Sequence, residues 1–486
     1  MRLLLALCLS ACAGSPGHAP EPVSPTPPAP APATAGQVAA SPIDLASVAH
    51  AAAAYLHTLA PERDRGLRDA LAGTPYGDDV RSVRFAATTV LRKAPDSTAD
   101  KVGVIARDAR AAVARAAPAG RGCTGRWIEI APRGWACEHA LVPSLDEPTP
   151  ARPASFDDDD ADDEPVVPGV YGVVRGKDVP AFASRSDALA GQSARLVTGA
   201  TSVRARGVAR VDGRRYWITT GGELIDAASI ATISPSKFRG VALDATTTLP
   251  LAWTHAHGRP HAKVVVRDMP SADGAITGEL APRTVVAIAE RSGDGRFVRV
   301  SQTGWIARAD LRIAAPAEPP PGTGSGEKWF DVDLDEQVLV AYEGPRAVYA
   351  TLVSTGKSTR RTPAAVARVI SKLESASMVS EKRDIYSVAD VPWTMYYDHN
   401  FALHTAYWHD GFGDQRSHGC INLAPRDARL LYRWSSPDVP PGWIAVYGDA
   451  DHPGSLVRVR SREVPEPAFR GYAETMHAKD AVTASR

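Results

Sequence analysis

Two stretches of the chain, residues 81–145 and 262–312, repeat one pattern of β-forming and turn residues. An Arg-x-x-Pro motif is followed eight residues later by glycine, at Arg92, Pro95 and Gly103 and again at Arg267, Pro270 and Gly278. A β-like run then leads to Gly-Trp, at Arg126–Ile130 with Gly134-Trp135 and at Arg296–Val300 with Gly304-Trp305. Short runs of aromatic and branched residues between turn residues predict small β units. The chain is therefore expected to be mainly β.

The repeated stretches resemble bacterial SH3-like β-barrel modules, which places one module at residues 80–147 and another at 241–313. A diverged third copy is expected at residues 169–240, because Arg215-Tyr216-Trp217-Ile218 and Gly222 follow in a similar order. The alternative for all three stretches is β structure of no particular family. The matched spacing argues against that alternative for the first and last stretches.

The N-terminus has the layout of an export signal. Met1-Arg2 precedes a short apolar run that ends in Leu9-Ser10-Ala11-Cys12, and such a run is too short to span a bilayer as a helix. The ending resembles a bacterial lipobox, with cleavage before Cys12 and lipidation of its sulfur. An ordinary signal peptide with a chance cysteine is the alternative. The lipobox predicts a signal at residues 1–11 and an exported, lipid-anchored protein, on the periplasmic face of the outer membrane if the cell is Gram-negative.

Composition separates the linkers and argues against two classes of protein. Proline, 40 of 486 residues, is dense in the Pro/Ala-rich linker expected at residues 12–42, and a short helical segment is expected at residues 43–79. An acidic linker is expected at residues 148–168 and a Pro/Gly linker at residues 314–327.

Lys+Arg and Asp+Glu both total 55, which argues against nucleic-acid binding by overall charge. No apolar run is long enough for a polytopic membrane protein. We expect a monomer.

Two of the five cysteines lie in the N-terminal signal region. Cys123 and Cys137 flank one strand-like run of the first module, and in an exported protein such a pair is most simply a disulfide. Closing that loop would stabilise the module by about 3 kcal/mol. Zinc is the alternative, but it needs four ligands and only His139 lies nearby. Cys420 remains as a free thiol.

One arrangement suits nucleophilic catalysis: His404, followed by Ser417-His418-Gly419-Cys420-Ile421-Asn422. A thiol attacks as thiolate, so it needs a base or a positive charge nearby, and a histidine from a separate strand can supply this. A glycine before the cysteine lets a substrate carbonyl approach backbone amides. These residue types suit acyl transfer through a thioester.

From the residues alone, two alternatives to catalysis remain. A lone cysteine in a soluble protein, such as Cys420, is more often a buried apolar side chain than a nucleophile. A metal site is the other alternative, although its spacing matches no common structural zinc pattern. Its ligands would be His399, His404, His409, His418 and Cys420.

The stretch around Cys420 resembles the active-site signature of L,D-transpeptidases with a YkuD-type catalytic domain. The similarity covers residues 328–449 and includes Trp329–Gln337, Val353–Lys357 and Thr362-Pro363. It implies a β-sandwich with short helices, followed by a C-terminal tail at residues 450–486. Pro425 is expected to begin one of the helices, because proline is tolerated in a first turn.

The resemblance also implies the catalytic roles. Cys420 would be the nucleophile and His404 the base that activates it, with the backbone carbonyl of Thr405 orienting the histidine ring. Amides around Gly419 and Cys420 would hold the oxyanion, and His418 would shape the same pocket. Thr405 stands where many members of the family have glycine, which would narrow the site.

Three further residues would support the substrate or the loop around the nucleophile. Ser417 and Asn422 match motif positions with this role, and Trp408 is a candidate for the wall of the substrate groove. Ala364-Ala365 replaces the small-Gly pair that follows Thr-Pro in the family. This departure removes no reacting group.

The implied reaction is L,D-transpeptidation of peptidoglycan, with stem peptides as donor and acceptor. Cys420 would attack the bond between the third residue and the terminal D-alanine of a tetrapeptide stem, and an amine on a second stem would resolve the acyl-enzyme. The resemblance implies neither metal nor organic cofactor. Water or a protein side chain as acceptor would instead make the chain an L,D-carboxypeptidase or a protein-anchoring enzyme. A wall-binding scaffold with a degenerate catalytic domain is a further alternative, against which the complete His404/Cys420 pair argues.

Overall fold

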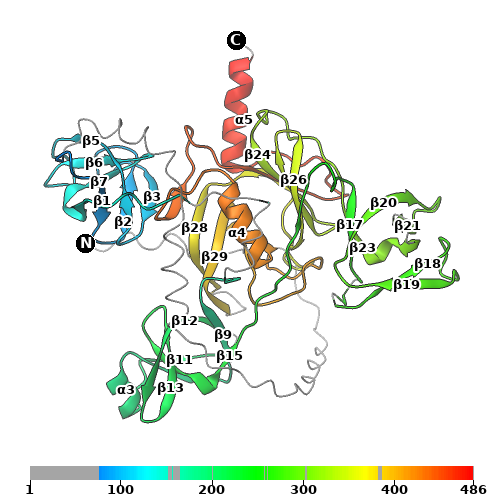
Figure 1. Ribbon diagram of the computed structural model, residues 1–486, viewed down its shortest axis with the longest axis horizontal. Coiled ribbons are helices and arrows are strands. Elements are labelled where there is room, and N and C mark those ends of the chain that lie inside the picture. The colour runs from blue at the N-terminus through cyan, green and yellow to red at the C-terminus, as the bar shows by residue number, and fades with distance from the viewer. Residues whose placement is uncertain are drawn as a thin grey trace, which may run out of the picture.

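The computed structural model describes residues 76–151, 156, 165–199, 201–256, 258–259, 261–300, 304–380 and 386–484. The expected signal, Cys12, the linker at residues 12–42 and most of the helical segment at residues 43–79 lie outside this part. The described chain is mainly β with a few short helices, as predicted. Three small modules are arranged around a larger C-terminal domain (Figure 1). None of the described helices is both long enough and apolar enough to cross a membrane.

The first module consists of two small sheets around a shared core. In one, β1 pairs with β4 and β8; in the other, β2 pairs with β3 and β7, and β6 lies between β5 and β7. Val83, Phe85, Ile128 and Ile130 are buried between the sheets. The elements are β1 (Ser82–Phe85), β2 (Thr89–Arg92), β3 (Lys101–Ile105), β4 (Arg110–Ala111), β5 (Val113–Ala117), β6 (Trp127–Ile130), β7 (Trp135–Cys137), a 3-10 helix (Glu138–Ala140) and β8 (Leu141–Ser144).

The third module repeats these pairings, with the single strand β20 in place of β4 and β5. β17 pairs with β20 and β23, β18 pairs with β19 and β22, and β21 lies between β20 and β22. Even the register agrees, since Arg92 faces Trp135 and Arg267 faces Trp305. The elements are β17 (Leu251–Thr254), β18 (Val264–Arg267), β19 (Ile276–Leu280), β20 (Val285–Arg291), β21 (Phe297–Val300), β22 (Trp305–Ala307), a 3-10 helix (Arg308–Asp310) and β23 (Leu311–Ala314).

The middle module has the same pattern, so the structure supports the diverged third copy. β9 pairs with β12 and β15, β10 pairs with β11 and β14, and β13 lies between β12 and β14. Helix α3, capped by the Ser184 hydroxyl, is inserted between the second and third strands, which explains the weaker sequence match. The elements are β9 (Val170–Val174), β10 (Val179–Phe182), α3 (Arg185–Ala190), β11 (Arg195–Val197), β12 (Thr201–Val211), β13 (Arg214–Thr219), β14 (Leu224–Asp226), a 3-10 helix (Ala227–Ser229) and β15 (Ile230–Thr232).

The modules are not closed barrels in the described part of the chain, which corrects the expectation of SH3-like barrels. Two of them place an edge strand against the C-terminal domain. β3 pairs antiparallel with β32, so that Gly103 faces Val446, and β12 pairs in parallel with β29, so that Ser202 faces Val388. These strands extend the sheets of a neighbouring domain, which satisfies their exposed backbone groups without barrel closure.

The C-terminal domain consists of two sheets that share the long strand β26. One has the order β16-β26-β25-β24-β33-β27, and the other has the order β32-β28-β29-β30 followed by β31 and β26. Helix α4 begins at Pro425, as expected, and its Ala428 and Leu431 side chains are buried in the core. The elements are β16 (Val241–Ala242), β24 (Lys328–Asp333), β25 (Val338–Glu343), β26 (Arg346–Ser354), β27 (Ala365–Arg368), β28 (Ser371–Ser380), β29 (Tyr386–Asp398), β30 (Phe401–Thr405), β31 (Ile421–Leu423), α4 (Pro425–Trp434), β32 (Trp443–Tyr447), β33 (Leu456–Arg460) and α5 (Gly471–Ala484).

Two expected boundaries move. β33 lies between β24 and β27 and pairs with both, so the C-terminal domain extends beyond residue 449 to at least Arg460. β16 pairs with β26, so residues 241–242 belong to this domain, and the third module begins only at Leu251. Helix α5 projects from the body of the protein at its C-terminal end (Figure 1).

Candidate active site

His404 and the cysteine motif come from two adjacent parallel strands. β30 and β31 pair so that Leu403 faces Ile421 and His404 faces Asn422, which places Cys420 beside the histidine strand. Leu403 and Ile421 point into the core and are fully buried. Since side chains alternate along a strand, His404 points to the opposite face. The His404 segment and the Cys420 motif, which are separated in the sequence, therefore lie side by side at one edge of the core.

The His404 ring is held by the backbone of the next residue. Its Nδ1 lies 2.9 Å from the carbonyl oxygen of Thr405. A carbonyl only accepts hydrogen bonds, so Nδ1 carries the hydrogen and Nε2 keeps its lone pair. Burial lowers the pKa of His404 to about 4, although the hydrogen bond to Thr405 acts in the opposite direction. The ring is thus neutral at neutral pH, and it contacts the Thr405 carbonyl that the resemblance implies.

The loop that carries Cys420 is fixed by internal hydrogen bonds. The Ser417 hydroxyl donates to the Cys420 carbonyl at 2.5 Å and accepts from the Gly419 N–H at 3.0 Å, while the Thr362 hydroxyl donates to the Gly419 carbonyl at 2.8 Å. Gly419 has a φ of 122°, and a Cβ there would lie 2.8 Å from the Phe401 ring. Ser417 is buried, so it supports the loop. The Gly419 amide already has an acceptor, and an oxyanion at this position would have to compete with Ser417.

Cys420 itself is partly exposed and is not in a disulfide. Its Sγ lies 3.7 Å from the carbonyl oxygen of Asn400, which immediately precedes β30. Cys420 immediately precedes β31, the strand that pairs with the strand of His404, and a partly exposed thiol with a neutral histidine on a neighbouring strand suits nucleophilic catalysis.

Asn422 is buried and lies on the same side of the strand pair as His404. Its side-chain amide nitrogen lies 3.0 Å from His409 Nε2, and the Gly411 N–H donates to His409 Nδ1 at 3.2 Å. Burial, with Arg416 as the next cause, lowers the pKa of His409 to about 4. The sequence placed His409 only among possible metal ligands. Its position five residues after His404, in the segment that leads to the cysteine, was the available signal.

Trp408 lies near His404. Its ring is partly exposed, lies 5.9 Å from the His404 ring and meets the Tyr407 ring edge-on at 4.9 Å. Thr405 is fully buried, and its hydroxyl has no hydrogen-bond partner within the described residues. His418 is partly exposed next to Gly419. The residues named from the sequence therefore lie on the paired strands β30 and β31 and in the segments that adjoin them.

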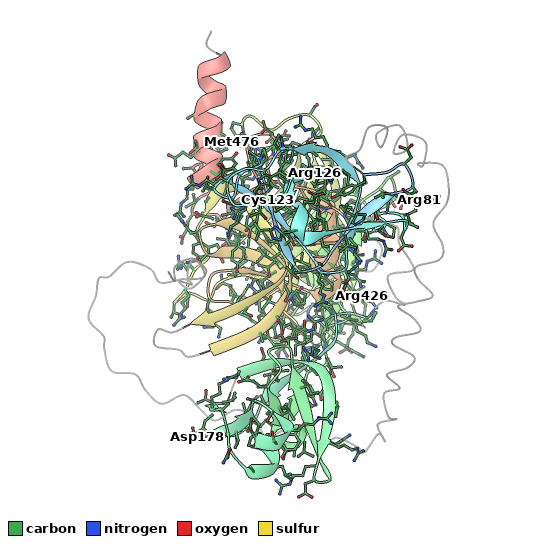
Figure 2. All side chains as sticks on the ribbon, turned by 90° about the vertical axis from the view of Figure 1, so that its left-hand side faces the viewer. Arg81, Cys123, Arg126, Asp178, Arg426 and Met476 are labelled. Carbon is green, nitrogen blue, oxygen red and sulfur yellow. A yellow bond between two sulfur atoms is a disulfide. The ribbon has the colours of Figure 1, made fainter. Side chains whose placement is uncertain are left out.

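Cys123 and Cys137 form a disulfide in the first module, as expected. His139 Nδ1 lies 2.8 Å from the Cys137 sulfur, so the three groups considered as zinc ligands are adjacent, with their two sulfurs bonded to each other. Cys123 and Arg126 both lie on this module in Figure 2.

Residues 327–459 match the family model of the L,D-transpeptidase catalytic domain, YkuD. The matched part ends within β33, at residue 459, in agreement with the extended boundary. No curated protein matches the chain.

Several solved L,D-transpeptidase structures are similar to parts of the chain. One from Stackebrandtia nassauensis is 24% identical over 28% of this chain and 57% of its own length, with a TM-score of 0.21. One from Mycobacterium smegmatis is 18% identical over 48% of this chain and 89% of its own, with a TM-score of 0.23. The catalytic domain of the E. faecium enzyme is 25% identical over 28% of this chain and 98% of its own, with a TM-score of 0.22. This chain thus spans less than two thirds of the Stackebrandtia protein.

Proposed function

We propose that the protein is a cysteine-dependent L,D-transpeptidase that cross-links peptidoglycan stem peptides. The observation that carries the proposal is the neutral His404 ring, fixed by the Thr405 carbonyl on the strand next to the Cys420 loop. The family of the catalytic domain supports the same reaction class. A nucleophile, a base and a group that orients the base are the elements of covalent acyl transfer.

In the proposed reaction, His404 Nε2 takes the proton of the Cys420 thiol as sulfur attacks the carbonyl between the third residue and the terminal D-alanine. The C–N bond breaks, the proton passes to the leaving amine, and D-alanine departs from a thioester. An amine of a second stem then attacks the thioester, His404 removes its proton, and the Cys420 thiol is restored. Each step balances without a redox partner.

The test is incubation of the soluble protein with a defined disaccharide-tetrapeptide, with products read by mass spectrometry. A cross-linked dimer and free D-alanine are expected. Cys420→Ala should abolish both products and the covalent adduct with a carbapenem, and persistence of that adduct would remove Cys420 as the nucleophile. Tripeptide alone would favour the L,D-carboxypeptidase reaction, and stems joined to a protein would favour an anchoring enzyme.

We also propose that the chain is exported and anchored by a lipid on Cys12. The Cys123–Cys137 disulfide supports an oxidising compartment. Expression of the full chain and of Cys12→Ser, followed by membrane fractionation and mass analysis of the N-terminus, tests this. Release of the wild type together with the variant in the soluble fraction would exclude the lipid anchor.

We further propose that the three modules are diverged SH3-like domains, on the basis of their common strand pairing and the sequence resemblance. Contact with cell-wall peptides is one role for them. Co-sedimentation of the inactive Cys420→Ala chain with purified sacculi tests that role, and full recovery in the supernatant would argue against it.

A further inference from the structure

The segment between the two catalytic elements, residues 409–416, is held by the C-terminal domain on one side. The Gly413 N–H donates to the Val353 carbonyl at 2.8 Å, and the Ser354 hydroxyl donates to the Gly411 carbonyl at 2.9 Å. The Arg416 N–H also donates to the Thr355 carbonyl at 3.0 Å. These bonds attach the segment to the end of β26. None of these three bonds involves the side chains of Asp410 and Asp414, the acidic residues of the segment.

The third module holds the same segment through Arg283. Its Nη1 lies 2.7 Å from the Asp410 carboxylate and its Nη2 donates to the Asp410 carbonyl, so one guanidinium makes two bonds to one residue. The Arg283 side chain is only 12% exposed, and its backbone has a φ of 60°. A left-handed backbone at a residue other than glycine is strained and persists only where the surroundings hold it.

A second contact from the third module lies four residues farther along. His255 is fully buried, and its Nε2 lies 3.0 Å from the Asp414 carboxylate. Arg312 Nε donates to the Gly413 carbonyl at 2.8 Å. Gly413 has a φ of 98°, and a Cβ there would lie 2.8 Å from the His255 ring. The close approach of the module to the segment therefore depends on a glycine.

A continuous set of contacts connects Arg283 with the catalytic strands. The Arg283 guanidinium carbon lies 5.0 Å from the centroid of the Phe238 ring. The Phe238 ring stacks on the Phe412 ring, with 6.2 Å between the two ring centroids. The Phe412 ring lies 4.9 Å from His409, whose Nε2 is 3.0 Å from the Asn422 amide. Asn422 faces His404 across the strand pair and follows Cys420 by two residues. Asp410 follows His409 directly in the chain, so a shift of Asp410 would move His409 and be transmitted to Asn422, the residue opposite His404.

We infer that the third module is a positioning element of the active site, and that Arg283 sets the alignment of His404 and Cys420 by fixing Asp410. Arg283 makes its contacts behind the site, so it is a positioning residue rather than a catalytic one. Misplacement of reacting groups by about 1 Å can lower a rate by 10²-fold. The inference rests on the proposed function only in assigning Cys420 as the reactive thiol.

The test compares Arg283→Ala and Arg283→Lys in the full mature chain with Arg299→Ala as a matched control. Arg299 is an arginine of the same module that pairs with Glu290 on an exposed face. Two probes are used: acylation by a carbapenem, and the pH profile of Cys420 alkylation by iodoacetamide, located by peptide mass. Arg283→Ala should slow acylation at least tenfold and move the alkylation profile toward that of an ordinary thiol. Arg283→Lys should restore part of the rate, because lysine keeps the charge but not the paired geometry.

Wild-type acylation and an unchanged alkylation profile in Arg283→Ala would overturn the inference. If that variant does not fold, Asp410→Asn, which retains the backbone contact to Arg283, is measured with the same two probes, and wild-type behaviour in both would overturn the inference equally. Alkylation needs no peptidoglycan, so the two proposals can fail separately. A wild type inactive on the tetrapeptide but with an Arg283-dependent alkylation profile would reject the proposed function and support the positioning role.

Discussion

His404 and Thr405 are linked by a 2.9 Å contact between the histidine Nδ1 and the carbonyl oxygen of its own neighbour in sequence. The contact fixes the tautomer, and burial lowers the pKa of the ring to about 4. The neutral, active form of His404 should therefore persist well below the usual histidine pKa of about 6.5. We expect the rate of carbapenem acylation to hold from pH 7 down to about pH 5 and to fall with a midpoint near pH 4.

His399 provides the control for this pH profile, because its side chain is 80% exposed beside the site. His399→Gln should not change the pH at which the acylation rate falls on the acid side. An inflection near pH 6.5 that persists in His399→Gln would show that the His404 ring titrates like a solvated histidine, and the burial argument would then be wrong.

The cysteine motif, the disulfide and the repeated strand pattern could be found in the sequence because each leaves a local pattern. The cysteine motif is contiguous, Cys123 and Cys137 flank one short strand, and the repeat preserves its spacing. The middle copy was harder to find because helix α3 interrupts it.

The contacts between domains were not predictable from these patterns. β3 pairs with β32, and Arg283 binds Asp410, across more than one hundred residues of sequence in each case. Backbone pairing at a sheet edge depends little on side-chain identity, and an exposed-looking arginine carries no mark of its partner. Strand β33 was not predicted for the same reason. Its Arg458 and Arg460 look like residues of a solvated tail in the sequence, and only the structure shows that both bind Asp331.

Gly419 offers a test of the nucleophile loop. Alanine there would meet both the φ of 122° and the Phe401 ring at 2.8 Å. We expect Gly419→Ala to slow acylation by about 100-fold and to lower the free energy of unfolding by about 1–3 kcal/mol. Gly191→Ala is the control, since Gly191 has a φ of 69° and no atom near its Cβ position. It should lose stability without losing rate, and equal rate losses in both variants would contradict the role assigned to the loop.

Removal of the disulfide should affect the first module and leave the site intact. Replacing Cys123 and Cys137 together by alanine removes a crosslink with a sequence separation of 14, which is worth about 3 kcal/mol. We expect a lower urea midpoint for that module and an unchanged acylation rate. Thiol titration of the wild-type chain that begins after Cys12 should find one thiol before reduction of the disulfide and three thiols after it. A large fall in acylation would show that the first module also acts on the site.

β33 is held in the catalytic domain by charge as well as by backbone pairing. Asp331 is 2% exposed and accepts from Arg458 at 2.7 Å and from Arg460 at 2.9 Å. Removing the shared carboxylate would leave two largely buried guanidinium groups without it, a change that typically costs 3–5 kcal/mol. We expect Asp331→Ala to lower the free energy of unfolding by about 3 kcal/mol or to prevent folding.

Truncation separates this electrostatic effect from the need for the strand itself. A chain ending at Asp449 lacks β33 and should fail to fold, because β24 and β27 would then expose two unpaired edges. A chain ending at Arg470 keeps β33 and the Arg470 N–H bond to the Val366 carbonyl at 3.0 Å, and it should remain folded and acylate. Arg462→Ala, at an arginine that is 76% exposed, should change stability by less than about 1 kcal/mol. A soluble, active chain ending at Asp449 would show that residues after 449 are a dispensable tail, and that β33 is not required for the domain to fold.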